Sequence, residues 1–472
     1  MSQRYESRFA RTRACSFALA VTLGLLGAPW AMAETAAEAP KAIDKAASTL
    51  ESLKELDGKA PARRSLNIQS WNTAEGARVL FVEAHELPMF DMRLLFAAGS
   101  SQDGATPGIA LVTNAMLNEG IKGKNVSAIA EGFEGLGADF GNGSYRDMAI
   151  ASLRSLSAAD KREPALKLFA DVVGKPTFPA DSLARIKNQL LAGFEYQKQN
   201  PGKLAGDELF KRLYGDHPYA HPSMGTAKSI APLTLAQLKA FHAKAYAAGN
   251  AVIALVGDLT RAEAEAVATQ VSAALPKGPA LAQTVAPTEP KPSETHIEFP
   301  SKQTHLMLAE LGITRGDPDY AALSLGNSIL GGGGFGSRLM TEVREKRGLT
   351  YGVSSGFTPM QAQGPFMISL QTRAELSENT LKLVKDITRD FLANGPTQKE
   401  LDDAKRELAG SFPLATASQS QSVTVEQIKT VMNKHLDADK LVIVTAGPTV
   451  PQKPLPPPTD KPAEQPLGVP EH

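Results

Sequence analysis

The sequence repeats itself, and this repeat limits the possible folds more than any other feature. Residues 233–239 (LTLAQLK) match residues 423–429 (VTVEQIK), and the same offset of 190 persists to 255–257 against 445–447. Self-similarity over such a distance indicates two copies of one structural unit. The chain has 472 residues, which is long enough for two separate hydrophobic cores. The sequence therefore predicts two tandem domains of the same fold.

The second copy is shorter than the first. Residues 191–193 match residues 408–410 at an offset of 217, which exceeds the downstream offset by 27 residues. The missing part corresponds to the region around 201–229 of the first copy, about one helix with its loop. We expect this loss to expose apolar surface on the second domain or to leave it poorly closed, unless a partner covers the gap.

Each copy contains groups of short strands and groups of helices, which is typical of an α+β fold with a mixed sheet packed by helices. In the first copy we expect strands at 66–71, 78–82, 92–96, 148–153 and 251–256, with helices at 108–117, 126–136, 159–172, 180–197, 202–214 and 235–247. In the second copy we expect strands at 295–299, 304–310, 351–357 and 365–371, with helices at 318–330, 337–347, 377–393 and 397–410.

Composition gives the boundaries of the domains. A Pro- and Ala-rich linker at 276–293 separates an N-terminal domain, 65–275, from a C-terminal domain, 294–448. The Pro-rich end of the chain, 449–472, has no apolar periodicity, and we expect an extended, mobile tail.

The N-terminus resembles a secretory signal. Several arginines precede an apolar run at 17–28 and a small-x-small site, Ala31-Met32-Ala33, so residues 1–33 are interpreted as a signal peptide cleaved after Ala33, with a leader at 34–64. The run is short for a membrane span, which needs ~20 apolar residues, although an uncleaved anchor is the alternative.

The only cysteine, Cys15, lies inside the signal, so the mature chain has no disulfide and no cysteine ligand. We expect a periplasmic or secreted protein with no membrane attachment after cleavage. A formal net charge of zero gives no indication of nucleic-acid binding.

A glycine-rich stretch in the second copy is the main candidate binding element. Gly331 to Gly334 and Phe335 precede an expected helix, which Gly348 ends, and Arg344 and Tyr351 lie on either side of that end. A guanidinium beside a phenol can bind a peptide carbonyl or a C-terminal carboxylate through charge-assisted hydrogen bonds. On these residues alone, an ordinary glycine loop with a solvated arginine is the other interpretation.

The repeat, the spacing from Arg344 to Tyr351 and the run from Tyr214 to Tyr219 (YGDHPY) together resemble the pitrilysin-like (insulinase) zinc peptidases. The likeness covers about 66–448 and is greatest to the branch that includes mitochondrial processing peptidase and the core subunits of the ubiquinol–cytochrome c reductase complex. Active members carry an inverted His-x-x-Glu-His motif, whose two histidines bind zinc and whose glutamate activates the bound water.

The zinc-site positions are degenerate in this chain. The resemblance places the motif on Leu111, Asn114 and Ala115, and the third ligand near 191–193, where no carboxylate occurs. None of these side chains can replace imidazole or a general base. His217 and His221 offer no substitute, because Pro218 and Pro222 interrupt any helix that would align them. We therefore expect no catalytic residue and no metal in this chain.

The resemblance implies that the substrate-binding half of the site survives. Arg344 and Tyr351 would hold a peptide, together with Gly332, Gly333, Gly334 and Phe335. Some bacterial members divide the work between a zinc-bearing subunit and a second subunit that keeps only the Arg and Tyr. The chain is thus expected to be a non-catalytic subunit that binds an unfolded peptide beside a homologous partner, with zinc only in that partner. A structural or peptide-binding protein without a peptidase partner is the alternative.

Overall fold

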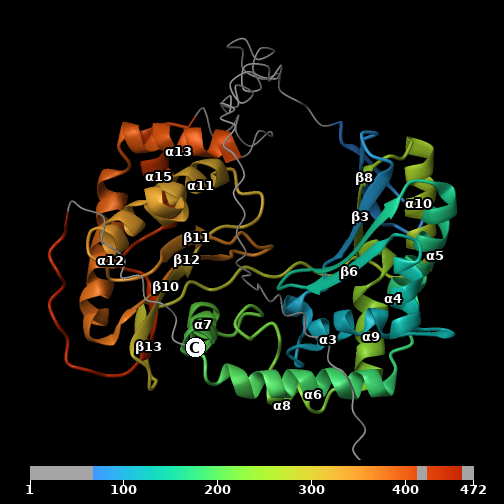
Figure 1. The fold of residues 1–472 in the computed structure, drawn as a ribbon, viewed down its shortest axis with the longest axis horizontal. Coiled ribbons are helices and arrows are strands. Elements are labelled where there is room, and N and C mark those ends of the chain that lie inside the picture. Colours follow the sequence, from blue (N-terminus) through green and yellow to red (C-terminus); the bar gives the residue numbers. More distant parts are fainter. Residues whose placement is uncertain (1–66, 412–422, 460–472) are drawn as a thin grey trace, which may run out of the picture. The chain divides into compact units, whose positions relative to one another are not determined.

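The computed structural model describes residues 67–411 and 423–459 (Figure 1). The expected signal peptide, the whole of the expected leader and the last part of the tail lie outside these residues. In the described part of the chain, no helix combines the length and the apolar character that a membrane crossing requires.

The first sheet is mixed and has six strands in the order β1-β2-β8-β3-β7-β6. Only β2 and β8 run parallel, and the other neighbouring pairs are antiparallel. The strands are β1 Gln69–Asn72, β2 Arg78–Glu83, β3 Met89–Phe96, β6 Asp139–Ser144, β7 Ala149–Leu156 and β8 Ala251–Gly257. The sequence did not predict β6, because Gly141 and Gly143 hide its alternation.

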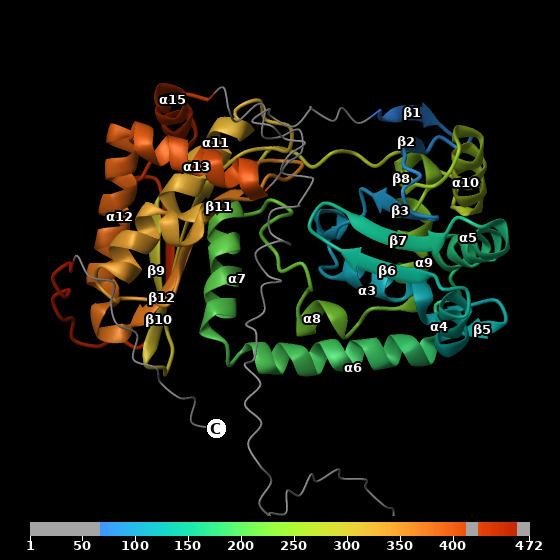
Figure 2. The same cartoon turned by 45° about the horizontal axis from the view of Figure 1, so that its top comes forward.

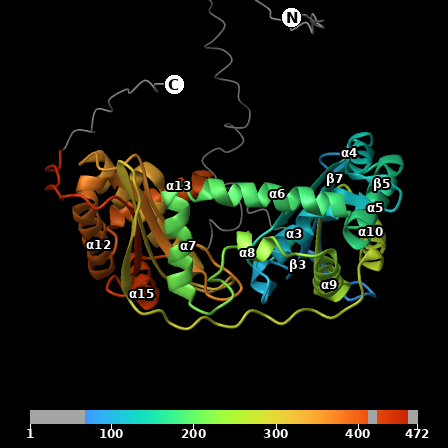
Figure 3. The same ribbon diagram turned by 90° about the horizontal axis from the view of Figure 1, so that it is seen from below.

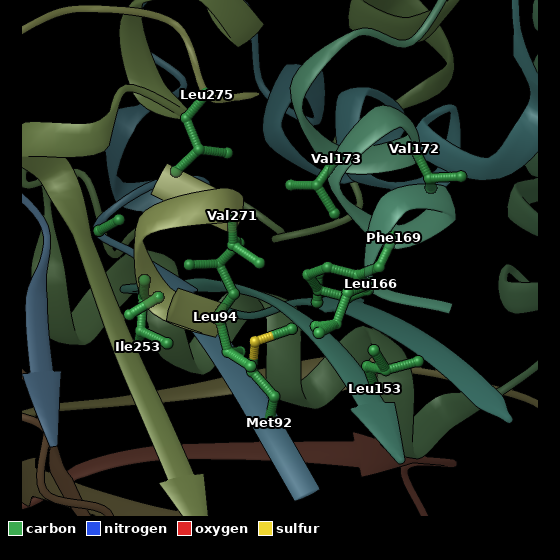
Figure 4. Packing of buried hydrophobic residues seen from close by; sticks show 14 of the residues in the cluster. Met92, Leu94, Leu153, Leu166, Phe169, Val172, Val173, Ile253, Val271 and Leu275 are labelled. Atoms are coloured by element: carbon green, nitrogen blue, oxygen red, sulfur yellow. The ribbon is translucent and has the colours of Figure 1, made fainter. Parts of the chain in front are cut away.

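One face of this sheet carries the main core of the first domain. Burial alternates along β3 and β7, so every second side chain points toward the helices α4 Val126–Glu134, α5 Ala159–Gly174 and α10 Arg261–Ala274. Figure 4 shows Leu166 and Phe169 of α5 and Val271 of α10 directed toward Met92 and Leu94 of β3. A second cluster joins the helices α3 Ile109–Ala115, α6 Ala180–Gln197, α8 Ala227–Ile230 and α9 Leu235–Ala245.

The second sheet repeats the first. Its order is β9-β13-β10-β12-β11, with β13 and β9 parallel, as β8 and β2 are. The strands are β9 Ser293–Glu298, β10 Gln303–Leu311, β11 Val353–Phe357, β12 Pro365–Arg373 and β13 Val442–Gly447, and the helices are α11 Tyr320–Asn327, α12 Ser377–Asn394, α13 Gln398–Ser411 and α15 Val425–His435. This arrangement agrees with the predicted fold of two tandem domains with mixed sheets packed by helices.

The matching heptapeptides mark the same structural device in both domains. Thr234 and Gln237 form a capping box at the start of α9, and Thr424 and Gln427 form one at the start of α15. In each, the threonine side chain accepts the N–H of the third helical residue, and the glutamine reaches back to the N–H of the cap. The repeat is therefore visible in the sequence where local hydrogen bonds fix the start of a helix.

Helix α7, Pro201–Tyr214, corrects the expectation about the shortened domain. It belongs by sequence to the first copy, yet it packs on β10 and β13 of the second sheet (Figures 1 and 2). Its buried residues Ala205, Leu209 and Leu213 form one cluster with Val444 and Ala446. Figure 3 shows the second sheet lying between α12 and α7. The apolar face that we expected to be exposed is covered from within the chain.

The burial of two equivalent strands, β8 and β13, shows the effect of α7. In β8 of the first sheet buried residues alternate with more accessible ones, whereas every residue of β13 is buried. The extra helix of the first copy thus converts a strand covered on one face into a strand covered on both.

The tail also differs from the expectation, in part. Residues 449–459 are extended as predicted, but hydrogen bonds attach them to the second domain. Thr449 donates to Glu298, the N–H of Lys453 to the carbonyl of Glu375 at 2.7 Å, and the N–H of Thr459 to the carbonyl of Lys346 at 2.9 Å. This first part of the tail is therefore held and not mobile.

We predict that Leu209→Ala destabilises the second sheet through a helix that the first copy supplies. Leu209 is fully buried against the second sheet, so its truncation leaves a cavity that should cost about 2–5 kcal/mol. Amide exchange in β13 should accelerate, as measured by hydrogen–deuterium exchange mass spectrometry. Lys211→Ala, on the exposed side of α7, should change stability by less than about 0.5 kcal/mol. Unchanged exchange in β13 would show that α7 does not support this strand.

Candidate functional site

The glycine-rich stretch forms a tight turn against β11. Residues Ser328–Gly332 (η5) continue α11 as a π-helical turn, and Gly334–Gly336 (η6) form a 3₁₀ turn. A Cβ on Gly331 would lie 2.6 Å from Ser355 Oγ, and Gly334 has a φ of +62°, so both positions require glycine. Asn327 fixes the approach, because its Nδ2 donates to the Ser355 carbonyl at 3.2 Å and its Oδ1 accepts from Ser355 Oγ at 2.7 Å.

The segment after the glycines is a π-helix where the sequence predicted an ordinary helix. Residues Met340–Glu345 (η7) are π-helical, and the N–H of Lys346 bonds to the carbonyl of Thr341, five residues earlier. Leu339, Met340 and Val343 face the core. The wide turn changes the direction of the side chains that follow it, and π-helical turns occur frequently at functional sites. Gly348, with a φ of +58°, ends the segment as predicted.

The basic residues along this segment are paired, with one exception among the described residues. Arg338 binds Glu400 at 2.7 Å, while Lys346 and Arg347 both bind Glu342, at 2.6 and 2.7 Å. The guanidinium of Arg344 has no carboxylate partner among the described residues. It lies instead over the ring of Phe335, with its carbon 4.6 Å from the ring centroid. The structure thus brings together two of the predicted site residues, Arg344 and Phe335.

Tyr351 lies on the connection between η7 and β11, which begins at Val353 and not at Tyr351 as predicted. Its side chain is strongly exposed, at 76%, and the Phe335 ring is exposed at 62%. The backbone on either side of Tyr351 is held by Thr372 Oγ1, which donates to the Leu349 carbonyl at 2.6 Å, and by Thr350 Oγ1, which donates to the Gly352 carbonyl. The structure gives no hydrogen bond between Tyr351 and Arg344. The observed contact among the three residues is that of Arg344 with Phe335, and both the Phe335 and the Tyr351 side chains are accessible.

The degenerate zinc positions lie on α3 as the resemblance implied, and Asn114 has a structural role there. Its Nδ2 donates to the hydroxyl of Tyr246 at 3.2 Å and to the carbonyl of Ile150 at 3.3 Å, and the residue is almost fully buried. Burial raises the pKa of Tyr246, so this phenol remains neutral. Leu111 and Ala115 offer only carbon atoms. At the position of the family's general base, this chain therefore has Asn114, a neutral residue that hydrogen-bonds to other buried groups.

The position of the family's third zinc ligand offers no ligand either. Residues 191–193 lie on α6 and carry no ligand. Within residues 67–411 and 423–459, the group of His, Asp and Glu close enough for a metal is Asp317, Asp319 and His435, in the second domain. Asp319 is already bonded to Lys434 and to His435 Nε2 at 2.9 Å, and these hydrogen bonds lower the pKa of its carboxyl group. His217 and His221 bond to separate backbone carbonyls, those of Val285 and Pro222.

A buried aspartate that the sequence did not single out fixes the start of α3. Asp103 accepts hydrogen bonds from the N–H groups of Gly108, at 2.7 Å, and Ala110, at 2.9 Å. Burial raises the pKa of this carboxyl group to about 7, against the opposing effect of the two N–H donors. A carboxylate a few residues before a helix is common on surfaces, so the sequence alone carries no signal of this burial.

The Tyr214-to-Tyr219 run joins α7 to the second domain. Tyr219 donates to Asp147, and its hydroxyl oxygen accepts the N–H of Ala362 at 3.1 Å. The Tyr214 hydroxyl donates to the carbonyl of Gln363 at 3.1 Å. The motif that contributed to the family resemblance is therefore structural here, since it holds the loop between β11 and β12.

Comparison with known proteins defines the family. Residues 78–227 match the family model described as insulinase (peptidase family M16), and residues 232–408 match the model described as the peptidase M16 inactive domain.

The chain belongs to the M16 (insulinase) peptidase family.

A Helicobacter pylori protein named non-peptidase homolog YmxG is 31% identical over 343 residues, which cover 71% of this chain and 78% of the relative. An uncharacterized zinc protease of Mycobacterium tuberculosis is 26% identical, over 76% of this chain and 88% of the relative. The crystal structure of a peptidase M16 inactive domain from Pseudomonas fluorescens has 75% identity and a TM-score of 0.81, covering 83% of this chain and all of that one. A Helicobacter pylori protease at 18% identity and a TM-score of 0.74 shares the fold. These matches and the degenerate motif identify an inactive M16 homologue, as the sequence predicted.

Restoring the motif alone should not restore the metal. We predict that the variant Leu111→His/Asn114→Glu/Ala115→His retains less than about a tenth of an equivalent of zinc after desalting, because catalytic zinc sites use three protein ligands and residues 191–193 supply none here. Metal content should be measured by atomic emission, with the wild type as reference. A full equivalent of bound zinc would show that another ligand of this chain completes the site.

The burial of Asp103 predicts a pH dependence of stability. The folded state holds this proton up to about pH 7, whereas the unfolded chain releases it near 3.8. The folded state therefore binds more protons between these values, and the free energy of unfolding should fall as pH rises from about 4 to 7. Asp103→Asn should make this slope shallower in urea titrations. Glu310, whose pKa burial also raises to about 7, contributes with the same sign, so Glu310→Gln is the matched comparison. An unchanged slope in both variants would contradict the assignment.

Proposed function

We propose that this chain is the non-catalytic, peptide-binding subunit of a heteromeric periplasmic zinc metallopeptidase. The observation that carries the proposal is the Arg344 guanidinium, which has no carboxylate partner in the described part of the chain and lies over the accessible ring of Phe335. The three other basic residues of 338–347 are each paired with a carboxylate within the domain. An arginine kept without a counter-ion is available to an acceptor oxygen from outside the chain.

The ligand that fits this patch is an extended peptide. Arg344 would donate to a backbone carbonyl or a C-terminal carboxylate, and the Tyr351 hydroxyl would donate to the peptide or to the tetrahedral intermediate. The glycines 332–334 lack side chains and would let a peptide backbone approach. The Tyr351 ring would contact apolar side chains of an unfolded substrate.

The partner is inferred from what this chain lacks. With no zinc ligand at the motif positions on α3 and none at residues 191–193, the metal and the general base would come from a homologous M16 chain that keeps the inverted motif. Such a chain would supply the zinc-bound water, and this one would supply the peptide clamp. The name of the Helicobacter pylori relative, non-peptidase homolog, supports a role for this kind of chain outside independent peptide cleavage. The signal-like N-terminus supports a periplasmic location for the complex.

Activity reconstitution tests the proposal. A mixed peptide pool is incubated with this chain, with a zinc-bearing homologue from the same genome, and with both. Cleavage should appear, or rise strongly, only in the mixture. Arg344→Ala should lower kcat/KM of the mixture about 10- to 100-fold, since a hydrogen bond to a charged group contributes about 1.5–3 kcal/mol. Tyr351→Phe should lower it about 10-fold.

The control for general effects of charge is Arg389→Ala, on the exposed side of α12, which should leave activity within about twofold. If the homologue is fully active alone and this chain adds nothing, the clamp is wrong, and the alternative of a structural or peptide-binding protein without a peptidase partner replaces it.

A further inference from the structure

The ring of Phe335 is placed where a hydrophobic side chain is costly. The ring follows the four glycines in the chain. It is 62% exposed and belongs to none of the hydrophobic clusters of the described residues. Gly334 and Gly336 flank it, and a Cβ at either of these glycines would meet no atom within 4 Å, so the loop tip is not packed. The contact that the ring does make is with the guanidinium of Arg344.

We propose that Phe335 is a positioning residue, which holds Arg344 in the orientation that receives the peptide oxygen. This inference rests on the proposed function. The guanidinium carbon lies over the ring, 4.6 Å from its centroid, and no carboxylate of the described residues pairs with the N–H groups at the edge of the guanidinium. Those edge donors are the ones that form paired hydrogen bonds with a carboxylate or a carbonyl.

The physical gain is pre-organisation. A long arginine side chain without an ion pair samples many rotamers, and binding must then pay for ordering it. Contact with the ring restricts the arginine side chain without offering an anion. The guanidinium charge therefore stays unpaired, while the direction of its N–H donors is fixed. A carboxylate in the place of Phe335 would orient Arg344 as well, but it would compete with the substrate. An aromatic ring orients Arg344 and does not compete with the substrate.

The first measurement needs no ligand. The order parameter of the Arg344 Nε–H group is measured by ¹⁵N relaxation in the full chain. We expect it to fall in Phe335→Ala, to remain near the wild-type value in Phe335→Tyr, and to be unaffected in Tyr196→Ala, an exposed aromatic residue of α6. Equal order in wild type and Phe335→Ala would overturn the proposal, whatever the peptide does.

The second measurement is a double-mutant cycle on binding of a fluorescein-labelled unstructured peptide, with a free and with an amidated C-terminus. Phe335→Ala should weaken binding about fivefold, Phe335→Tyr should restore it, and Phe335→Ala should have no further effect once Arg344 is Ala. Independent, additive losses would mean that Phe335 acts on the peptide directly, and would overturn the positioning role. A larger loss with the free carboxylate than with the amide would identify the C-terminus as the oxygen source, and equal losses would identify a backbone carbonyl.

The two proposals fail in different ways. If Arg344→Ala leaves peptide binding unchanged, the proposed clamp is wrong. If Arg344→Ala abolishes binding while Phe335→Ala changes neither binding nor the order of the Arg344 side chain, the clamp stands and the positioning role is wrong.

Discussion

The packing of α7 on the second sheet is the interaction on which the rest of the structure depends. The second copy of the repeat has lost the residues that correspond to this helix, and the helix of the first copy covers β10 and β13 instead. Because β13 is buried on both faces, the second domain is complete only in the presence of the first. Tyr214 and Tyr219 extend this attachment by hydrogen bonds to residues 362 and 363. The glycine turn and η7 therefore stand on a sheet whose stability comes partly from the other half of the chain.

The two domains differ in the hydrogen bonding and charge pairing of their candidate site residues. On α3, the position of a general base now holds Asn114, whose amide satisfies a buried phenol and a backbone carbonyl. This position offers no metal ligand, because the amide donates its N–H groups to buried acceptors. Around η7 the reverse holds, since Arg344 is left without an anion and Phe335 is left in solvent. Groups that are costly to leave unsatisfied are the ones expected to meet a ligand, and this contrast supports the assignment of the binding role to the second domain.

Much of the architecture could be predicted because it is encoded locally. The capping boxes of α9 and α15, the alternation in β3 and β7, and the stop at Gly348 each depend on residues close together in the chain. The strand β6 could not be predicted, since its glycines remove the alternation and only pairing with β7 defines it. The π-helical form of η7 was equally invisible, because its residues have ordinary helix-forming composition and the extra residue per turn is accommodated by packing against β11.

The sequence by itself determined that two copies of one fold exist, because the repeat follows from residue identity and spacing. Through its resemblance to the M16 family it also showed that the side chains at the zinc-site positions have been replaced. Only the tertiary structure decided which sheet α7 covers, that Asp103 is buried beneath the start of α3, and that Arg344 alone among the basic residues of 338–347 lacks a carboxylate partner in the described chain. The physical reason is the same in each case. Burial and charge pairing are set by groups distant in sequence, such as Glu400 for Arg338, and no local pattern records which of several cations a distant carboxylate will reach.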